Sequence, residues 1–186
     1  ANDKLTGKRV TTSDYASANY YYVNKSSLPK FYGGFNTSLS WKGFDLSAIF
    51  AYSIGGYIYN RDITMILHNG SLEGRDWSTE ILKRWTPENR YTDVPALSTT
   101  SNNWNSASTR FLQNNSYMRL KNLTLSYDLP KQWISKLALS SVQVFVQGDN
   151  LFTIHRNQGL DPEQGITGIT YYRYPAMRTI SGGINL

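Results

Sequence analysis

Residues 142–153 have the pattern of a β-strand with one apolar and one polar face. The apolar positions are Val142, Val144, Val146 and Phe152, and the positions between them include Gln143, Gln147 and Asp149. A period of two is typical of a strand whose faces meet different surroundings. No proline occurs from residue 139 to 153, and about ten alternating residues suffice for a tilted strand to cross a bilayer. We interpret this segment as a transmembrane β-strand.

Four other segments alternate in the same way and are predicted strands, at residues 31–41, 44–59, 113–129 and 177–186. The first two are separated only by Lys42 and Gly43, which predicts a tight hairpin. The glycine pairs at 55–56 and 182–183 are expected to be strand bends or places of close packing. The chain is therefore predicted to be all-β and antiparallel.

The strand at 113–129 changes phase along its length. Leu123, Leu125 and Tyr127 share one parity, whereas Met118 and Leu120 share the other. A β-bulge near Asn122 is the ordinary way to switch parity, and it keeps Arg119 and Lys121 away from lipid. The alternative is that these two cations lie beyond the hydrocarbon, at the level of the lipid head groups.

The connections between these strands alternate between long and short. Residues 1–30, 60–112 and 155–174 are long, turn-rich segments, whereas 42–43 and about 130–138 are short. Within the second long connection, the spacing of Trp77, Ile81, Leu82 and Trp85 predicts one short amphipathic helix. Short turns on one side and long loops on the other are typical of outer-membrane barrels, and a β-sandwich does not sort its connections in this way.

Composition narrows the class of protein. The 186 residues are 14% aromatic and include fourteen tyrosines, and the mean hydropathy is −0.46. No apolar run reaches the length of a transmembrane helix, so composition fits either an outer-membrane barrel or a soluble β-sandwich. The chain has no cysteine and a formal charge of +6 without a run of like charges, so no nucleic-acid partner is predicted. Residues 1–4 carry no export signal.

The sequence offers little catalytic chemistry. His68 and His155 are far apart and lack metal-ligand spacing, and each is expected to be a solvated loop side chain. Asp161, Pro162 and Glu163 are interpreted as a turn, although the two carboxylates could also be offered to a cation or a partner. No nucleophile elbow or phosphate-binding glycine motif occurs. We predict no enzyme activity, no cofactor and no metal.

Five sequence strings in order resemble the C-terminal third of the SusC/RagA family of TonB-dependent outer-membrane transporters. The strings are WKGFDL at 41–46, RWTPEN at 84–89, YMRLKNLTL at 117–125, QGDNLFT at 147–153 and GLDPE at 159–163. The resemblance covers about residue 29 to 186. It departs from the family at the last residue, Leu186, where such barrels commonly end in phenylalanine.

The resemblance implies a transmembrane β-barrel of about 22 strands, of which this chain holds the last five, with one short helix in a long extracellular loop. Five strands do not close a barrel, so earlier strands are expected to be missing. Residues 1–30 are then an extracellular loop, and 31–186 are the strands, turns and long loops of an incomplete barrel domain. The implied partners are an N-terminal plug, a SusD-like surface lipoprotein, the TonB complex and outer-membrane lipid.

We therefore predict TonB-dependent import of a sizeable nutrient, an oligosaccharide or a peptide, across the bacterial outer membrane. The candidate residues for contact with the ligand or the lipoprotein lid are aromatic or cationic loop residues, namely Trp77, Trp85, Trp104, Tyr171, Tyr172 and Arg173. Self-packing of the loops is an equally good interpretation of these residues. The alternative function is a soluble β-sandwich that binds carbohydrate, which requires two sheets that enclose Val144, Phe50 and Leu125 between them.

Overall fold

The fold was analysed in a computed structural model of the chain. The structure describes residues 14–70, 72–100, 103–135, 139–159, 161–163, 167–170 and 172–186. These residues divide into two compact units, which are described separately. The sheet unit comprises Ser26–Tyr57, Asn114–Thr167 and Arg173–Leu186, and the loop unit comprises Ala1–Lys25, Ile58–Gln113 and Gly168–Tyr172.

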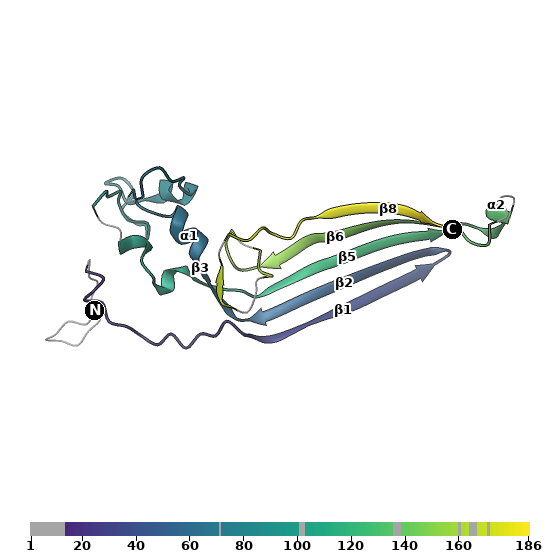
Figure 1. The fold of residues 1–186 in the computed structure, drawn as a ribbon, viewed down its shortest axis with the longest axis horizontal. Helices are drawn as coiled ribbons and strands as arrows, with labels where there is room; N and C mark the ends of the chain where they lie inside the picture. The colour runs from purple at the N-terminus through teal and green to yellow at the C-terminus, as the bar shows by residue number, and fades with distance from the viewer. Residues whose placement is uncertain are drawn as a thin grey trace. The chain divides into compact units, whose positions relative to one another are not determined.

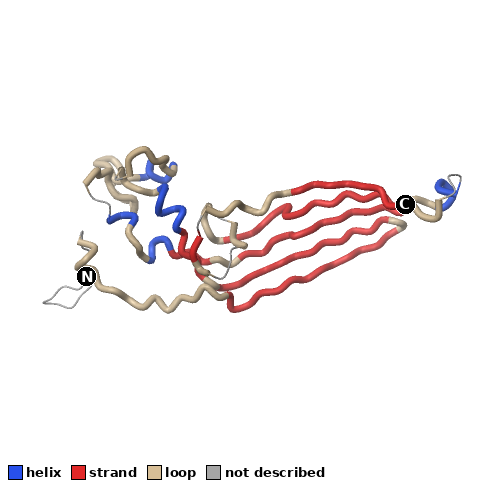
Figure 2. Tube along the Cα trace, viewed as in Figure 1, coloured by secondary structure: helices blue, strands red, loops and turns tan. Residues whose placement is uncertain are grey.

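The sheet unit is built on one antiparallel sheet of five strands in the order β1-β2-β5-β6-β8 (Figure 1). The strands are β1 (Pro29–Trp41), β2 (Phe44–Gly55), β5 (Tyr117–Asp128), β6 (Gln143–His155) and β8 (Thr179–Asn185). Each long strand pairs with the next long strand along the chain, and the red strands of Figure 2 run side by side as a meander. The strands predicted from the period of two are thus confirmed.

The hairpin between β1 and β2 has the two-residue turn that the sequence predicts. Lys42 and Gly43 both have positive φ, 48° and 86°, a combination that matches the right-handed twist of the flanking strands and favours glycine. Gly43 O accepts a hydrogen bond of 2.8 Å from Asp128 N. The turn is therefore tied to the strand that pairs with β2.

The register places apolar residues on one face of this sheet across all five strands. Residues opposite one another in paired strands share a face, and one such row is Leu39, Leu46, Leu125, Val146 and Gly182. The neighbouring row on the other face is Ser38, Ser47, Thr124, Gln147 and Ser181. No described residue whose register puts it on the apolar face carries a charge.

A β-bulge at Lys121 keeps the apolar face continuous. Ile49 pairs with Asn122 and Phe50 pairs with Leu120, so Lys121 is the extra residue of β5. The bulge brings Met118 and Leu120 onto the same face as the leucines beyond it, as the parity of the sequence predicts. The pairing of β5 with β6 is irregular at the same place, because Leu120 pairs with Phe152 whereas Asn122 pairs with Asp149.

Aromatic rings line the end of the apolar face at the short connections. Trp41 pairs with Phe44, and the rings of Phe44 and Tyr127 lie 4.4 Å apart. Lys42 Nζ lies 5.0 Å from the centre of the Trp41 ring, a cation–π contact. Aromatic residues at strand ends are typical of the border of the apolar band in outer-membrane barrels.

The apolar face remains open among the described residues, which disagrees with the β-sandwich alternative. Val144 is 43% exposed and Leu125 is 42% exposed. Phe50 is half-buried and stacks on Phe35, with ring centroids 4.7 Å apart. A sandwich requires these side chains to be enclosed between two sheets.

None of the described helices is long and apolar enough to cross a bilayer.

The loop unit is more ordered than the loop chemistry of its sequence predicts. A short sheet in the order β4-β3-β7 joins β3 (Tyr57–Asn60), β4 (Leu112–Asn114) and β7 (Ile169–Thr170). Among the described residues of this unit, four apolar side chains are buried and form its core, those of Ile58, Ile81, Val94 and Phe111. The connection between the strands is therefore a folded body with its own core.

Three sequence predictions need correction. The predicted strand 44–59 is two strands, because Gly55 and Gly56 both adopt positive φ and break it. Likewise, the predicted strand 113–129 divides into β4 and β5. The predicted helix 77–85 is the shorter 3-10 helix η1 (Thr79–Lys83), capped where Ser78 Oγ accepts from Glu80 N at 3.3 Å.

The structure contains further short elements that the period analysis misses. The helix α1 (Arg61–Ile66) begins where Asn60 Oδ1 accepts a 3.0 Å hydrogen bond from Ile63 N. A single capping residue carries no hydrophobic period and gives no long signal. The other elements are η2 (Asn103–Asn105), η3 (Thr109–Phe111) and α2 (Lys131–Ile134).

Replacing Phe111 with alanine tests whether the loop unit has a separate core. Phe111 is 1% exposed and its ring lies 6.2 Å from that of Tyr59, so Phe111→Ala is expected to cost roughly 3–5 kcal/mol of stability. Hydrogen exchange should then quicken in residues 58–113 and stay unchanged in β5 and β6. The control is Leu82→Ala, because Leu82 is exposed. Unchanged exchange in 58–113 contradicts the assignment.

Candidate functional site

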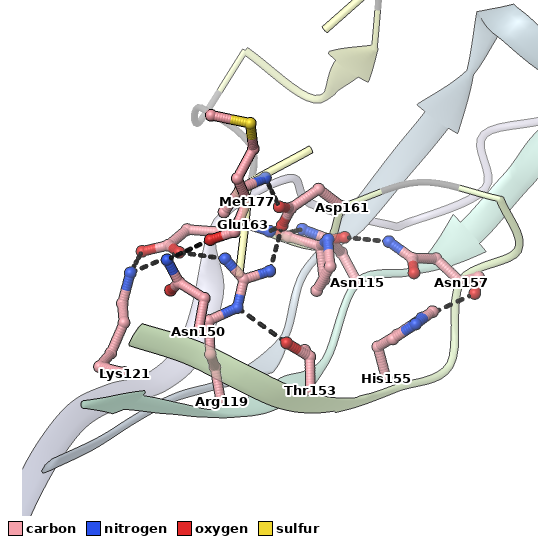
Figure 3. A network of polar contacts seen from close by, with 12 residues as sticks. Asn115, Arg119, Lys121, Asn150, Thr153, His155, Asn157, Asp161, Glu163 and Met177 are labelled. Carbon is pink, nitrogen blue, oxygen red and sulfur yellow. Dashed lines mark hydrogen bonds and ion pairs between the residues drawn. The ribbon is translucent and has the colours of Figure 1, made fainter. Parts of the chain in front are cut away.

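The polar face of the sheet carries a buried arginine next to the long connections. Arg119 in β5 is 4% exposed, and Figure 3 shows its guanidinium surrounded by three partners. Nε donates to Thr153 Oγ1 at 2.8 Å, Nη1 donates to Glu163 Oε2 at 2.8 Å and Nη2 donates to Asp161 Oδ1 at 2.5 Å. Because all three nitrogen atoms of the guanidinium donate hydrogen bonds, its orientation is fixed.

The bulge residue binds the same loop. Lys121 Nζ lies 2.6 Å from both carboxylate oxygens of Glu163. Asp161 and Glu163 therefore belong to an ion-pair network with two cations of β5. The segment predicted as a turn at 161–163 thus also forms ion pairs with the sheet. Both of its carboxylates are bound within the chain rather than offered to a partner.

The environment of Asp161 favours its ionised form. Burial raises the pKa of this carboxyl, but hydrogen bonds from Ala176 N and Glu163 N and the Arg119 guanidinium lower it by more. Ala176 N donates to Oδ2 at 2.6 Å and Glu163 N donates to Oδ1 at 2.9 Å. The net result is a pKa below the ordinary value, so Asp161 is a carboxylate at neutral pH.

Amide side chains attach the rest of this connection. Asn115 Nδ2 donates to Pro162 O at 2.9 Å, and Asn157 Nδ2 donates to Asn115 Oδ1 at 2.9 Å. Asn150 Nδ2 donates to Met177 O at 3.2 Å. Asn115 lies just before β5 and Asn150 lies within β6, so these bonds join the connection to the sheet (Figure 3). The loop is thereby held against the polar face of the sheet.

A cavity of about 370 Å³ lies beside the network within the sheet unit. Its lining is rich in cations and hydrogen-bonding groups and includes Arg119, Asn150, Thr153, His155, Asp161, Arg173 and Arg178. Among the described residues no group of three or more histidine or acidic side chains has the arrangement of a metal site. The cavity is therefore lined largely by polar and cationic groups.

Sequence and structure comparisons assign the family. No protein-family model matches the chain. It is 33% identical over 169 residues to TonB-dependent receptor P3 and 30% identical over 171 residues to TonB-dependent receptor P26, both from Formosa agariphila. These matches cover 85% and 87% of this chain, and 16% and 17% of the relatives.

Solved structures agree with the sequence relatives. The RagAB peptide importer in its closed-closed state aligns over 99% of this chain and 20% of that chain, with 34% identity and a TM-score of 0.82. Its open-open state aligns over 98% of this chain and 19% of that chain, with 33% identity and a TM-score of 0.80. The chain belongs to the SusC/RagA-type TonB-dependent receptors. This confirms the resemblance seen in the sequence, for a segment about one-sixth to one-fifth as long as its relatives.

The site residues predicted from the sequence of this receptor segment lie in both units. Arg173 belongs to the sheet unit and lines the cavity. Trp77, Trp85, Trp104 and Tyr172 belong to the loop unit. Tyr171 lies outside the described residues.

Two of these tryptophans have partners within the loop unit of the receptor. Trp77 Nε1 donates to His68 Nδ1 at 3.1 Å, and His68 is completely buried. The expectation of a solvated His68 is therefore wrong, because its ring packs against Trp77. The indole of Trp104 donates to Leu67 O, and the guanidinium of Arg110 lies 3.5 Å from the centre of its ring. Trp77 is nevertheless exposed, as are Trp85 and Tyr172.

The loop unit has a cavity of its own that the sequence analysis did not identify. It has a volume of about 540 Å³, and its lining includes Tyr15, Tyr20, Tyr21 and Tyr59. Tyr15 Oη donates to Ala107 O at 2.9 Å. Tyr59 is far from residues 15–21 along the chain, so only the fold shows that these tyrosines line one cavity.

The network around Asp161 predicts an acid dependence of the loop. Because the folded chain lowers the pKa of Asp161 below its ordinary value of 3.8, its stabilising effect is complete above that value and is lost as the pH falls through the folded pKa. Hydrogen exchange of the described residues between 156 and 178, corrected for intrinsic rates, should quicken as the pH falls below that ordinary value.

Asp161→Asn should show weak protection of the loop at every pH and a smaller acid response. Asp93→Asn is the control, because the Asp93 side chain is 85% exposed in its pair with Arg110. The same acid response in wild type and Asp161→Asn contradicts the role given to Asp161.

Proposed function

We propose that this segment forms part of the wall and outer connections of an outer-membrane β-barrel that imports a sizeable nutrient in a TonB-dependent manner. The observation that carries the proposal is the continuous, charge-free apolar face of five paired strands. An exposed apolar face of this extent matches contact with lipid hydrocarbon, and it would aggregate in water. The family of the chain supports the same function.

The dimensions of the strands support a membrane-spanning wall. β1 and β6 have 13 residues and β2 and β5 have 12, whereas a tilted strand needs about 9–11 to cross the hydrocarbon. In the described sheet β1 and β8 each pair on one side only. Because unpaired backbone groups are not tolerated in lipid, further strands of a barrel of about 22 strands are proposed to pair with both edges.

The two faces of the wall then have different tasks. The apolar face contacts lipid, and the polar face, with Asn122, Thr124 and Gln147, faces the interior that a plug domain fills. The solute is proposed to be an oligosaccharide or a peptide, and the related RagAB structures are those of a peptide importer. A SusD-like surface lipoprotein and the TonB complex are the proposed partners.

The long connections are proposed to lie outside the cell and to meet the solute or the lipoprotein lid. Of the residues proposed from the sequence, Trp77, Trp85 and Tyr172 are exposed in the loop unit, and aromatic faces suit sugars and peptides. Trp77 and Trp104 also hold the loop unit together through their indole hydrogen bonds. Replacing the latter two is therefore expected to affect folding as well as binding.

A pair of arginine substitutions tests whether the apolar face meets lipid. Leu125 and Thr124 are neighbours in β5 on opposite faces of the sheet. Leu125→Arg should lower the stability of the full receptor in bilayers by roughly 2–4 kcal/mol, because the charge enters hydrocarbon. Thr124→Arg should have a much smaller effect. The measurement is reversible unfolding by denaturant, and equal costs for both variants contradict the proposed orientation.

Uptake tests the transport function. Cells that depend on the full receptor for an oligosaccharide or peptide nutrient should lose uptake when the receptor gene or TonB is deleted. Restoring wild-type receptor should restore uptake, and Trp85→Ala or Tyr172→Ala should reduce it if these residues meet the solute or the lid. Uptake that survives deletion of either gene contradicts TonB-dependent import.

A further inference from the structure

The cavity of the sheet unit has an excess of positive charge. Its lining includes Arg119, Arg173 and Arg178. The charge of Arg119 is balanced by Asp161 and Glu163, and Glu163 is shared with Lys121. Arg173 and Arg178 have no hydrogen-bond or ion-pair partner within the part of the chain that the structure describes. Two guanidinium groups are therefore available to a ligand.

The carboxylates of the network explain why these two arginines remain available. Asp161 accepts from Arg119, Glu163 N and Ala176 N, and Glu163 accepts from Arg119 and Lys121. Both acidic side chains next to the cavity are thus already bound. An anion that reaches the cavity meets no uncompensated carboxylate on the residues that line it.

A buried acceptor adjoins the same cavity. Asn150 Oδ1 is inaccessible to solvent and has no hydrogen-bond partner. The orientation of the amide follows from its nitrogen, which donates to Met177 O at 3.2 Å. A buried acceptor without a partner costs free energy, and rotation of this side chain toward the cavity would let Oδ1 accept from a hydroxyl or N–H next to the anionic group of a ligand.

We propose that Arg173 and Arg178 bind a carboxylate of the transported solute on the polar face of the sheet. Arginine matches a carboxylate through two parallel hydrogen bonds, and the Asn150 amide lines the same cavity. A uronic acid and the C-terminus of a peptide both have this chemistry. The proposal rests on the transport function and narrows its substrate to acidic solutes.

The test uses the full receptor, purified with its lipoprotein partner, and four defined probes. The first pair is an oligogalacturonate and its methyl ester, and the second pair is a short peptide with a free C-terminal carboxylate and the same peptide as an amide. Calorimetry measures the affinity of each probe for wild type, for the double variant Arg173→Gln/Arg178→Gln and for Arg156→Gln. Arg156 is a matched control, because it is exposed and absent from the lining of this cavity.

The proposal predicts that wild type binds one acidic probe on the order of tenfold or more tighter than its neutral partner, the range of a charged hydrogen bond. The pair that shows the difference identifies the solute as a sugar acid or a peptide. The double variant should lose this preference while its binding of the neutral probe is unchanged, and Arg156→Gln should keep it. Retained binding of the neutral probe shows that the double variant is folded.

Equal affinity of wild type for the charged and neutral probes of both pairs overturns the proposal, as does a preference that survives the double substitution. Neither result contradicts TonB-dependent import, because that function is tested by the uptake of the nutrient in wild-type cells. Loss of the transport function is recognised separately, because uptake would then be independent of the receptor gene and of TonB. The two failures are thus distinguishable.

Discussion

The structure depends on one constraint, that a single face of five paired strands remains apolar along its whole length. A slip of one residue in any pairing would exchange that face with the polar one. The bulge at Lys121 absorbs such a slip within β5, so that Leu120 and Leu123 share a face although their spacing in sequence is odd. Without it, half of the strand would present Asn122 and Thr124 on the apolar side.

The same irregularity connects the sheet to the connection that follows β6. Lys121 and Arg119, which cannot lie on the apolar face, both bind carboxylates of the connection at 161–163. The cavity with Arg173 and Arg178 lies beside this network. In the proposed receptor, the residues that fix the loop on the wall therefore also shape the place where a solute carboxylate would bind. On this proposal, the rigidity of the wall and the recognition of the solute would have a common structural basis.

The sequence predicts the sheet much better than the loops, for physical reasons. Strands carry a period of two over many residues, and the parity change around Lys121 was sufficient to predict the bulge. The loop unit is held by isolated contacts such as Trp77 with His68, which leave no period. Arg119 and Asp161 are 42 positions apart, so their pairing appears only when the register is known. Of the proposed site residues, Arg173 lines the cavity of the sheet unit. Arg178 lines the same cavity, but no pattern in the sequence predicts this.

The proposed orientation of the sheet is tested most directly by measuring which residues of β5 are exposed to lipid. The chain has no cysteine, so single cysteines at residues 118–127 of the full receptor in bilayers can each carry a spin label. Collision rates with oxygen, which concentrates in lipid, and with a water-soluble nickel chelate report the surroundings of each label. The account predicts lipid exposure at Met118, Leu120, Leu123, Leu125 and Tyr127, with the change of phase at Lys121. Unbroken alternation through Lys121, or water exposure at all five positions, would contradict it.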